Sequence, residues 1–156
     1  MNSANETGFV LDPRLAADTI FIADWELSRV LLMDDSRFPW LILVPRRRGL
    51  VELTDLPFED RMELLREADR ALALLRAIAR CDKFNIGALG NIVRQLHVHV
   101  VARREGDAAW PGPVWGSGVP LRYEPAEREA LIQGLSNPPA PDPREILCIM
   151  RRSRDD

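Results

Sequence analysis

The sequence predicts one α+β domain built on an antiparallel β-sheet of about five strands, with one long helix and shorter helices packed on it. Three observations support this class. Short apolar runs separated by turn residues fill the first third of the chain. A long amphipathic helix pattern follows, and two further strand patterns come after it. This order is typical of an antiparallel sheet with helices on one face.

The first third of the chain predicts a short helix and three strands. Asp12 supplies an N-cap and Pro13 a first helical residue, so a helix is expected over residues 11–17. Apolar runs at 19–22 and 25–33 predict two strands. Pro39 precedes a third, very apolar run at 40–44, and the short polar link at 34–36 indicates a hairpin with the strand before it.

The central helix is expected to begin near Thr54 and Asp55, where capping residues, Pro and acidic residues cluster, and to end near Arg80. Its apolar side chains recur at three- and four-residue spacing and predict a stripe that packs on the sheet. A strand is expected at 84–86. The stripe comprises Leu64, Leu65, Ala68, Ala71, Leu72, Leu75, Ile78 and Ala79, and the side chains expected in solvent are Glu63, Glu67, Arg70 and Arg76.

Both histidines of the chain lie in the stretch 85–103. Alternating residues predict a strand that has one apolar face in the core and carries Gln95, His97 and His99 on the other. Gly87 and Gly90, just upstream, permit a tight turn and let a ligand approach backbone N–H groups.

Three interpretations of the paired histidines are open. A half-exposed strand carries polar residues on its outer face without any function. A His-x-His pair can also bind a metal, but a third ligand is needed and Cys81 and Cys148 are isolated from it in the sequence. Carboxylates from elsewhere in the chain could complete such a site, so this interpretation is open but disfavoured, and no metal ligand is assigned. The third interpretation is a reaction at phosphorus, with a neutral imidazole as the nucleophile and its neighbours holding phosphate oxygens.

The residues around the histidines resemble the histidine-triad (HIT) superfamily, whose signature is His-φ-His-φ-His-φ-φ with φ apolar. This chain has Gln95-Leu-His97-Val-His99-Val-Val, so Gln stands at the first triad position. The family's upstream Asn-x-Gly and Gly-Gln-x-Val correspond to 85–87 and 90–93, with Asn91 in place of Gln. The trailing Pro-Arg corresponds to 102–103. The resemblance covers roughly residues 27–110 and implies the HIT-like fold.

The resemblance also implies a mechanism and site residues. His97 would be the nucleophile that forms a nucleotidyl-histidine, the Gln95 carbonyl would orient it, and His99 would bond phosphate oxygens. The Gln95 side chain could donate a hydrogen bond to phosphate but could not carry a proton to the leaving group. An acidic residue would hold the ribose, with Asp34 the closer match, Asp35 an alternative, and a turn-capping role equally open. The remaining implied substrate-binding residues are Asn85, Gly90, Asn91, Arg103 and Trp110.

The expected function is therefore a nucleotide-binding hydrolase or nucleotidyl transferase that cleaves a phosphoanhydride or phosphoramidate of a nucleotide conjugate. The alternative is a catalytically weak nucleotide-binding or sensor module, which the departures at Gln95 and Asn91 favour. No cofactor is expected, and Mg²⁺ is expected only as a counter-ion of the substrate. Relatives pair as homodimers, with the segment around Trp110 reaching the partner, so a homodimer is expected here.

Composition agrees with one globular domain of 156 residues, with 46% hydrophobic and 29% charged residues. A net charge of −3 does not indicate binding to nucleic acid or membranes, and no apolar run reaches the roughly 18 residues of a membrane span. Two distant cysteines fit a reducing compartment, so a cytoplasmic protein is expected. The predicted division is a HIT-like domain at 1–118, with its core at about 9–110, and a C-terminal extension at 119–156 packed on the domain or across the dimer.

Overall fold

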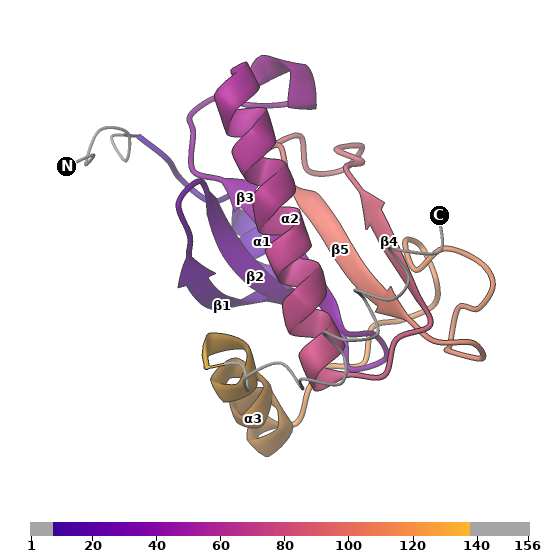
Figure 1. Ribbon diagram of the computed structural model, residues 1–156. Coiled ribbons are helices and arrows are strands. Elements are labelled where there is room, and N and C mark those ends of the chain that lie inside the picture. Colours follow the sequence, from indigo (N-terminus) through magenta and orange to yellow (C-terminus); the bar gives the residue numbers. More distant parts are fainter. Residues whose placement is uncertain (1–7, 138–156) are drawn as a thin grey trace, which may run out of the picture.

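The structure, a computed structural model, describes residues 8–137. Residues 1–7 and 138–156, which include Cys148 and the end of the predicted extension, lie outside the described part. Five strands form one antiparallel sheet in the order β1-β2-β3-β5-β4 (Figure 1). The predicted fold class is therefore confirmed. The strands are β1 Thr19–Asp24, β2 Ser28–Met33, β3 Trp40–Pro45, β4 Lys83–Gly87 and β5 Val98–Arg103.

Within residues 8–137, three α-helices and one 3₁₀ turn accompany the sheet: α1 Pro13–Asp18, η1 Leu53–Asp55, α2 Phe58–Ile78 and α3 Pro125–Ser136. The long helix α2 lies across one face of the sheet, and α3 lies near the C-terminal end of α2 (Figure 1). As far as residue 136, the C-terminal extension packs against α2 and β1 of its own chain. None of the helices in the described part of the chain combines the length and apolar character that crossing a membrane requires.

The sheet is covered on both faces, and each face has its own apolar core. Between α2 and the sheet lie Leu64 and Leu75 of the helix with Val98 and Val100 of β5, and α3 joins this core through Leu135. The opposite face carries Ile42 and Val101, together with Trp40, Phe38, Val114 and Leu15. Because Leu15 belongs to α1, this helix lies on the second face, and the expectation that all helices lie on one face is wrong for α1.

The N-terminal cap of α1 is confirmed, since the Asp12 carboxylate accepts a hydrogen bond from the Arg14 backbone N–H at 2.8 Å. The start of α2 differs from the prediction. Its N-cap is Pro57, and Asp55 instead accepts hydrogen bonds from the backbone N–H groups of residues 51 and 52, at 3.0 and 2.8 Å. Asp55 therefore stabilises the turn before the helix rather than the helix itself.

Two side chains of α2 also differ from the prediction. Leu65, expected in the apolar stripe, is 56% exposed. Glu67, expected in solvent, is only 3% exposed. Its Oε1 accepts hydrogen bonds from the backbone N–H groups of Leu27 and Ser28 at 2.8 and 3.2 Å. These two donors stand just where β2 begins, so Glu67 joins the helix to the sheet through hydrogen bonds that an apolar side chain could not make.

Candidate active site

The two histidines lie where the loop after β4 enters β5. Gly90 in this loop has a φ of +69°, a conformation that L side chains rarely adopt, so glycine is required there. The sequence predicted a strand that already includes residue 95. This start is wrong, because β5 begins only at Val98. His97 therefore precedes the strand and His99 lies within it. The two imidazole centroids lie 4.8 Å apart, with the ring planes at 74°.

His97 is held by its own local backbone. Its Nδ1 lies 2.6 Å from the carbonyl oxygen of Gln95, and the residue is 6% exposed. A carbonyl oxygen can only accept, so Nδ1 must carry the proton and Nε2 must carry the lone pair. The orienting bond expected between His97 and the Gln95 carbonyl is present in the structure.

His99 is held by a side chain from the neighbouring strand. The indole N–H of Trp40 donates to Nδ1 of His99 at 3.0 Å, and the two rings lie 5.4 Å apart. Burial, and to a smaller extent the neighbouring His97, lowers the pKa of His99 to about 3. His99 is therefore a neutral imidazole near pH 7.

A cavity of about 410 Å³ opens in front of both imidazoles. Most of its wall is apolar, and the charged side chains on it are Arg14 and Asp18 of α1. This combination suits a planar aromatic group beside a small number of directed polar contacts. The other lining residues are Leu15, Met33, Trp40, Leu89, Gly90, Asn91, Ile92, Val93, Trp115, Gly116 and Pro120.

The predicted site residues divide into those that line this cavity and those that do not. His97, His99, Gly90 and Asn91 line it together. Gln95 does not, since its side-chain amide donates to the Val10 carbonyl at 2.9 Å and accepts from the Asp12 backbone N–H at 2.9 Å. The expectation that this amide would meet a phosphate is therefore not supported. Gln95 contributes its main-chain carbonyl to the site and uses its side chain to hold the N-terminal segment.

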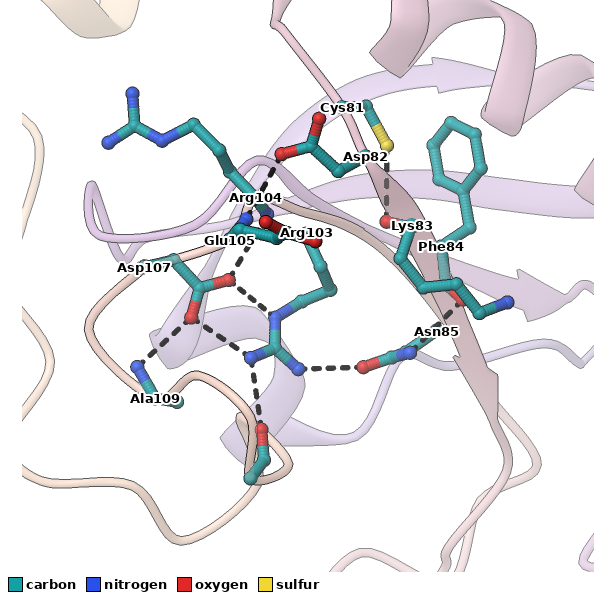
Figure 2. A network of polar contacts seen from close by, with 11 residues as sticks. Cys81, Asp82, Lys83, Phe84, Asn85, Arg103, Arg104, Glu105, Asp107 and Ala109 are labelled. Carbon is teal, nitrogen blue, oxygen red and sulfur yellow. Dashed lines mark hydrogen bonds and ion pairs between the residues drawn. The ribbon is translucent and has the colours of Figure 1, made fainter.

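Arg103, Asn85 and Trp110 form a separate structural network beyond the cavity. Figure 2 shows the polar contacts of Arg103 and Asn85. The Arg103 guanidinium is 2% exposed as a side chain and makes two hydrogen bonds to the Asp107 carboxylate, at 2.7 and 2.9 Å. It also donates to Asn85 Oδ1 at 2.7 Å and to the Gly112 carbonyl at 2.9 Å. The guanidinium carbon lies 5.7 Å from the centroid of the Trp110 ring. The substrate-binding roles expected for these three residues are not supported within this chain, because Arg103 and Asn85 are already paired and none of the three lines the cavity.

Asp34 and Asp35 lie at a neighbouring cavity of about 350 Å³, which shares Asp18, Met33 and Trp40 with the first. Asp35 is 2% exposed and ion-paired to Arg37 at 2.7 Å. Burial opposes its ionisation, but hydrogen bonds from Arg37 and Leu121 outweigh burial and hold the pKa of Asp35 below its usual range.

Both oxygens of Asp34 are also occupied, and its side chain is 11% exposed. Its carboxylate accepts from Arg122 at 2.8 Å and from the Tyr123 backbone N–H at 3.0 Å, both in the segment leading to α3. Asp35 accepts hydrogen bonds from Arg37 in its own turn and from the Leu121 backbone N–H. Both acids therefore hold local structure and the segment before α3, and the ribose-binding role expected for either one stays a prediction.

Sequence reasoning missed four residues of the site: Trp40, Trp115, Arg14 and Asp18. The strand register could have indicated Trp40. In the pairing of β3 with β5, Ile42 stands opposite His99, so Trp40, two residues earlier on the same face, is a diagonal neighbour of the histidine. Trp115 comes from a loop whose path is not encoded in any periodic pattern. Among residues 8–137, no group of three or more His, Cys, Asp or Glu side chains is arranged to hold a metal ion.

Comparison with known proteins places this geometry in a family. The sequence pattern of the HIT domain matches residues 14–106. The chain is 36% identical over 85 residues to the AP-4-A phosphorylase of Mycobacterium tuberculosis, a match that covers 51% of this chain and 43% of that protein. The chain therefore aligns with less than half the length of this curated relative.

Solved structures agree over most of the chain. A histidine triad protein from Bradyrhizobium japonicum is 50% identical, with a TM-score of 0.79 and coverage of 81% of this chain and 95% of its own. A histidine triad protein from Sinorhizobium meliloti is 46% identical, with a TM-score of 0.81 and coverage of 84% and 97%. A third, from Marinobacter aquaeolei, is 43% identical with a TM-score of 0.73 and coverage of 81% and 95%. The chain belongs to the histidine triad (HIT) family.

Proposed function

We propose that this protein is a nucleotide-binding hydrolase or nucleotidyl transferase that forms a nucleotidyl-histidine on His97. The observation that carries the proposal is the 2.6 Å contact between His97 Nδ1 and the Gln95 carbonyl, which leaves Nε2 with its lone pair. The cavity in front of that nitrogen, about 410 Å³, has room for one nucleoside monophosphate group.

The first step would be attack by the His97 Nε2 lone pair on a phosphorus of the substrate. A bond from nitrogen to phosphorus forms as the bond from phosphorus to the leaving oxygen or nitrogen breaks, and the leaving group takes that electron pair. The imidazole becomes cationic in the adduct, and its Nδ1–H is already directed at the Gln95 carbonyl, which stabilises the developing charge. His99 would donate its Nε2–H to a phosphate oxygen.

The second step would return the enzyme to its starting state. Water or a phosphate acceptor attacks the phosphorus and loses a proton, and the electron pair of the breaking bond to nitrogen goes back to His97. Splitting one difficult displacement into two is the usual advantage of covalent catalysis. A phosphoanhydride or phosphoramidate of a nucleotide fits this sequence, and similarity to a protein named AP-4-A phosphorylase supports a dinucleoside polyphosphate among the candidates.

The proposed test is acid quenching during turnover, followed by intact-mass spectrometry. Two probes, a diadenosine polyphosphate and an adenosine phosphoramidate, would be compared. The wild-type chain should gain the mass of one adenylyl group with at least one probe, and His97→Gly should gain none. Ile92→Ala is the matched control, because Ile92 lines the same cavity, is 73% exposed and has no reactive atom.

A second candidate, a nucleotide-binding module with little turnover, is favoured by the structural use of the Gln95 side chain, which leaves the cavity without an evident general acid. The same experiment separates the two. Thermal stabilisation by adenosine monophosphate without any adduct or product would support the binding module and contradict the enzyme.

A further inference from the structure

The indole of Trp40 makes a hydrogen bond that constrains the chemistry of His99. An indole has one N–H donor and no acceptor nitrogen. Since it points at Nδ1 of His99 from 3.0 Å, Nδ1 must carry a lone pair, and the single proton of the neutral ring must be on Nε2. His97 has the opposite arrangement, because its Nδ1 faces a carbonyl oxygen. The two histidines are thus held as opposite tautomers, one presenting a lone pair and the other an N–H.

The surroundings keep the His99 ring from rotating away from this bond. Trp40 and His99 are each 6% exposed and come from paired strands. The ring of Trp115 stands edge-on to both, with centroids 5.6 Å from His99 and 6.2 Å from Trp40. Rotation of the imidazole would break its hydrogen bond to Trp40. Packing therefore supports the ring position in which the hydrogen bond from Trp40 fixes the tautomer.

The charge state of His99 agrees with the geometry. A second proton on the ring would have to sit on Nδ1, directly facing the Trp40 N–H, so protonation would break the bond. The titratable or charged groups that share the cavity with His99 are His97, Asp18 and Arg14, and none of them is a hydrogen-bond partner of its ring in this structure.

We infer that Trp40 is a positioning residue that holds His99 as a neutral Nε2–H donor toward the substrate. The catalytic part of this inference rests on the proposed function. Without the indole N–H, His99 can exchange its proton between the two nitrogens and present a lone pair to an anionic oxygen for part of the time. The bond to be lost is one hydrogen bond between neutral groups, so the expected loss of kcat is about threefold to tenfold, with KM nearly unchanged.

The test needs two variants at position 40 and one control. Trp40→Phe removes the N–H, and Trp40→3-benzothienylalanine removes it while keeping the shape of the indole. Trp115→Phe is the control, because it removes an indole N–H beside the same imidazole that has no hydrogen-bond partner in the structure. The measured quantities are the ¹⁵N chemical shifts of the four ring nitrogens, which belong to the only two histidines of the chain, and the kinetic constants with one substrate.

The spectra should show Nε2 protonated on His99 and Nδ1 protonated on His97 in the wild type and in Trp115→Phe. Both Trp40 variants should shift the His99 signals toward exchange between tautomers. A protonated Nδ1 on wild-type His99, or an unchanged tautomer in the benzothienyl variant, would overturn the inference. So would an altered tautomer with unchanged kcat.

The spectra are recorded on the free protein, so they do not depend on turnover. If the wild type shows no turnover and no adduct, the proposed function fails, and the role of Trp40 is then decided by affinity for adenosine monophosphate. A weaker affinity in the benzothienyl variant than in wild type would keep Trp40 as a positioning residue for a binding site. Equal affinity of the wild type and the benzothienyl variant for adenosine monophosphate would show that Trp40 has no positioning role.

Discussion

The pair of Arg103 and Asp107 should contribute more to stability than any surface ion pair of this protein. Their side chains are 2% and 9% exposed, and two hydrogen bonds join them. Asp107→Asn keeps the shape of the side chain but leaves the guanidinium buried without its counter-charge. Removing one partner of a buried pair costs about 3–5 kcal/mol, because the remaining charge is uncompensated. For a chain of this length, that corresponds to a fall in Tm of roughly 6–20 °C.

Urea and thermal unfolding would measure this effect. Glu63→Gln is a suitable control, because Glu63 pairs with Arg66 at 3.0 Å, but these side chains are 28% and 71% exposed. An exposed pair of this kind contributes about 0–1 kcal/mol, so the control should unfold close to the wild type. If Asp107→Asn also unfolds within 1 kcal/mol of the wild type at pH 7, the reasoning about burial is wrong.

The dependence on pH gives an independent check. Hydrogen bonds from Arg103 hold the pKa of Asp107 below its usual range, against the smaller opposing effect of burial. A carboxyl whose folded pKa is depressed stabilises the fold fully above its unfolded pKa, about 3.9, and loses this contribution as pH falls through the folded value. The stability gap between wild type and Asp107→Asn should therefore stay constant from pH 7 to 5 and shrink below about pH 4. A gap that widens on acidification would contradict this account.

Two further predictions concern assembly and the cavity wall. We expect a homodimer, as in the relatives that the sequence resembles, and light scattering at tens of micromolar would contradict this by giving the mass of one chain. A Cβ at Gly87 would lie 3.2 Å from Cη2 and 3.3 Å from Cζ2 of Trp115, so Gly87→Ala should displace that ring by a few tenths of an ångström and raise KM for a nucleotide substrate. Gly134→Ala is the control, since its Cβ meets only Ile78 at an ordinary 3.6 Å, and equal KM values in the two variants would refute the prediction.

The sequence predicted the parts of this protein that depend on local patterns. Short apolar runs located β1, β2 and β3, alternation located β5 apart from its start, and the cap at Asp12 located α1. The bond between His97 and the Gln95 carbonyl joins residues two apart, so the histidine motif implied it. Each of these features depends on residues that lie close together in the sequence, so the period and spacing of residue types are enough to predict it.

The contacts that the sequence did not predict join residues far apart in the chain. Trp40 and His99 are separated by 59 positions, and Glu67 reaches backbone groups 39 and 40 positions away. A charged residue such as Glu67 or Arg103 is usually exposed, and only its partners make burial favourable. Identifying those partners requires the register of the sheet and the path of the loops, which no periodic pattern contains.

Gln95 is the residue for which the sequence and the structure predict the most different roles. Gln95 stands where the family signature has a histidine, so the sequence alone predicts that Gln95→His supplies a missing acid and accelerates cleavage most for poor leaving groups such as amines. The structure instead uses both ends of the amide to hold the segment before α1, through the Val10 carbonyl and the Asp12 N–H. Arg14 and Asp18, which line the cavity, belong to the helix that follows.

The structure therefore predicts a different outcome for Gln95→His. A histidine cannot reproduce the two bonds made by the oxygen and nitrogen on one amide carbon, so the variant should lose about 1–3 kcal/mol of stability. Cleavage should slow by a similar factor for an amine and for pyrophosphate leaving from the same nucleotide. Gln95→Glu, which keeps an acceptor for Asp12 but loses the donor to Val10, should be destabilised as well. A selective gain for the amine in Gln95→His, with Tm unchanged, would show that position 95 meets the leaving group and that its role as a tether is wrong.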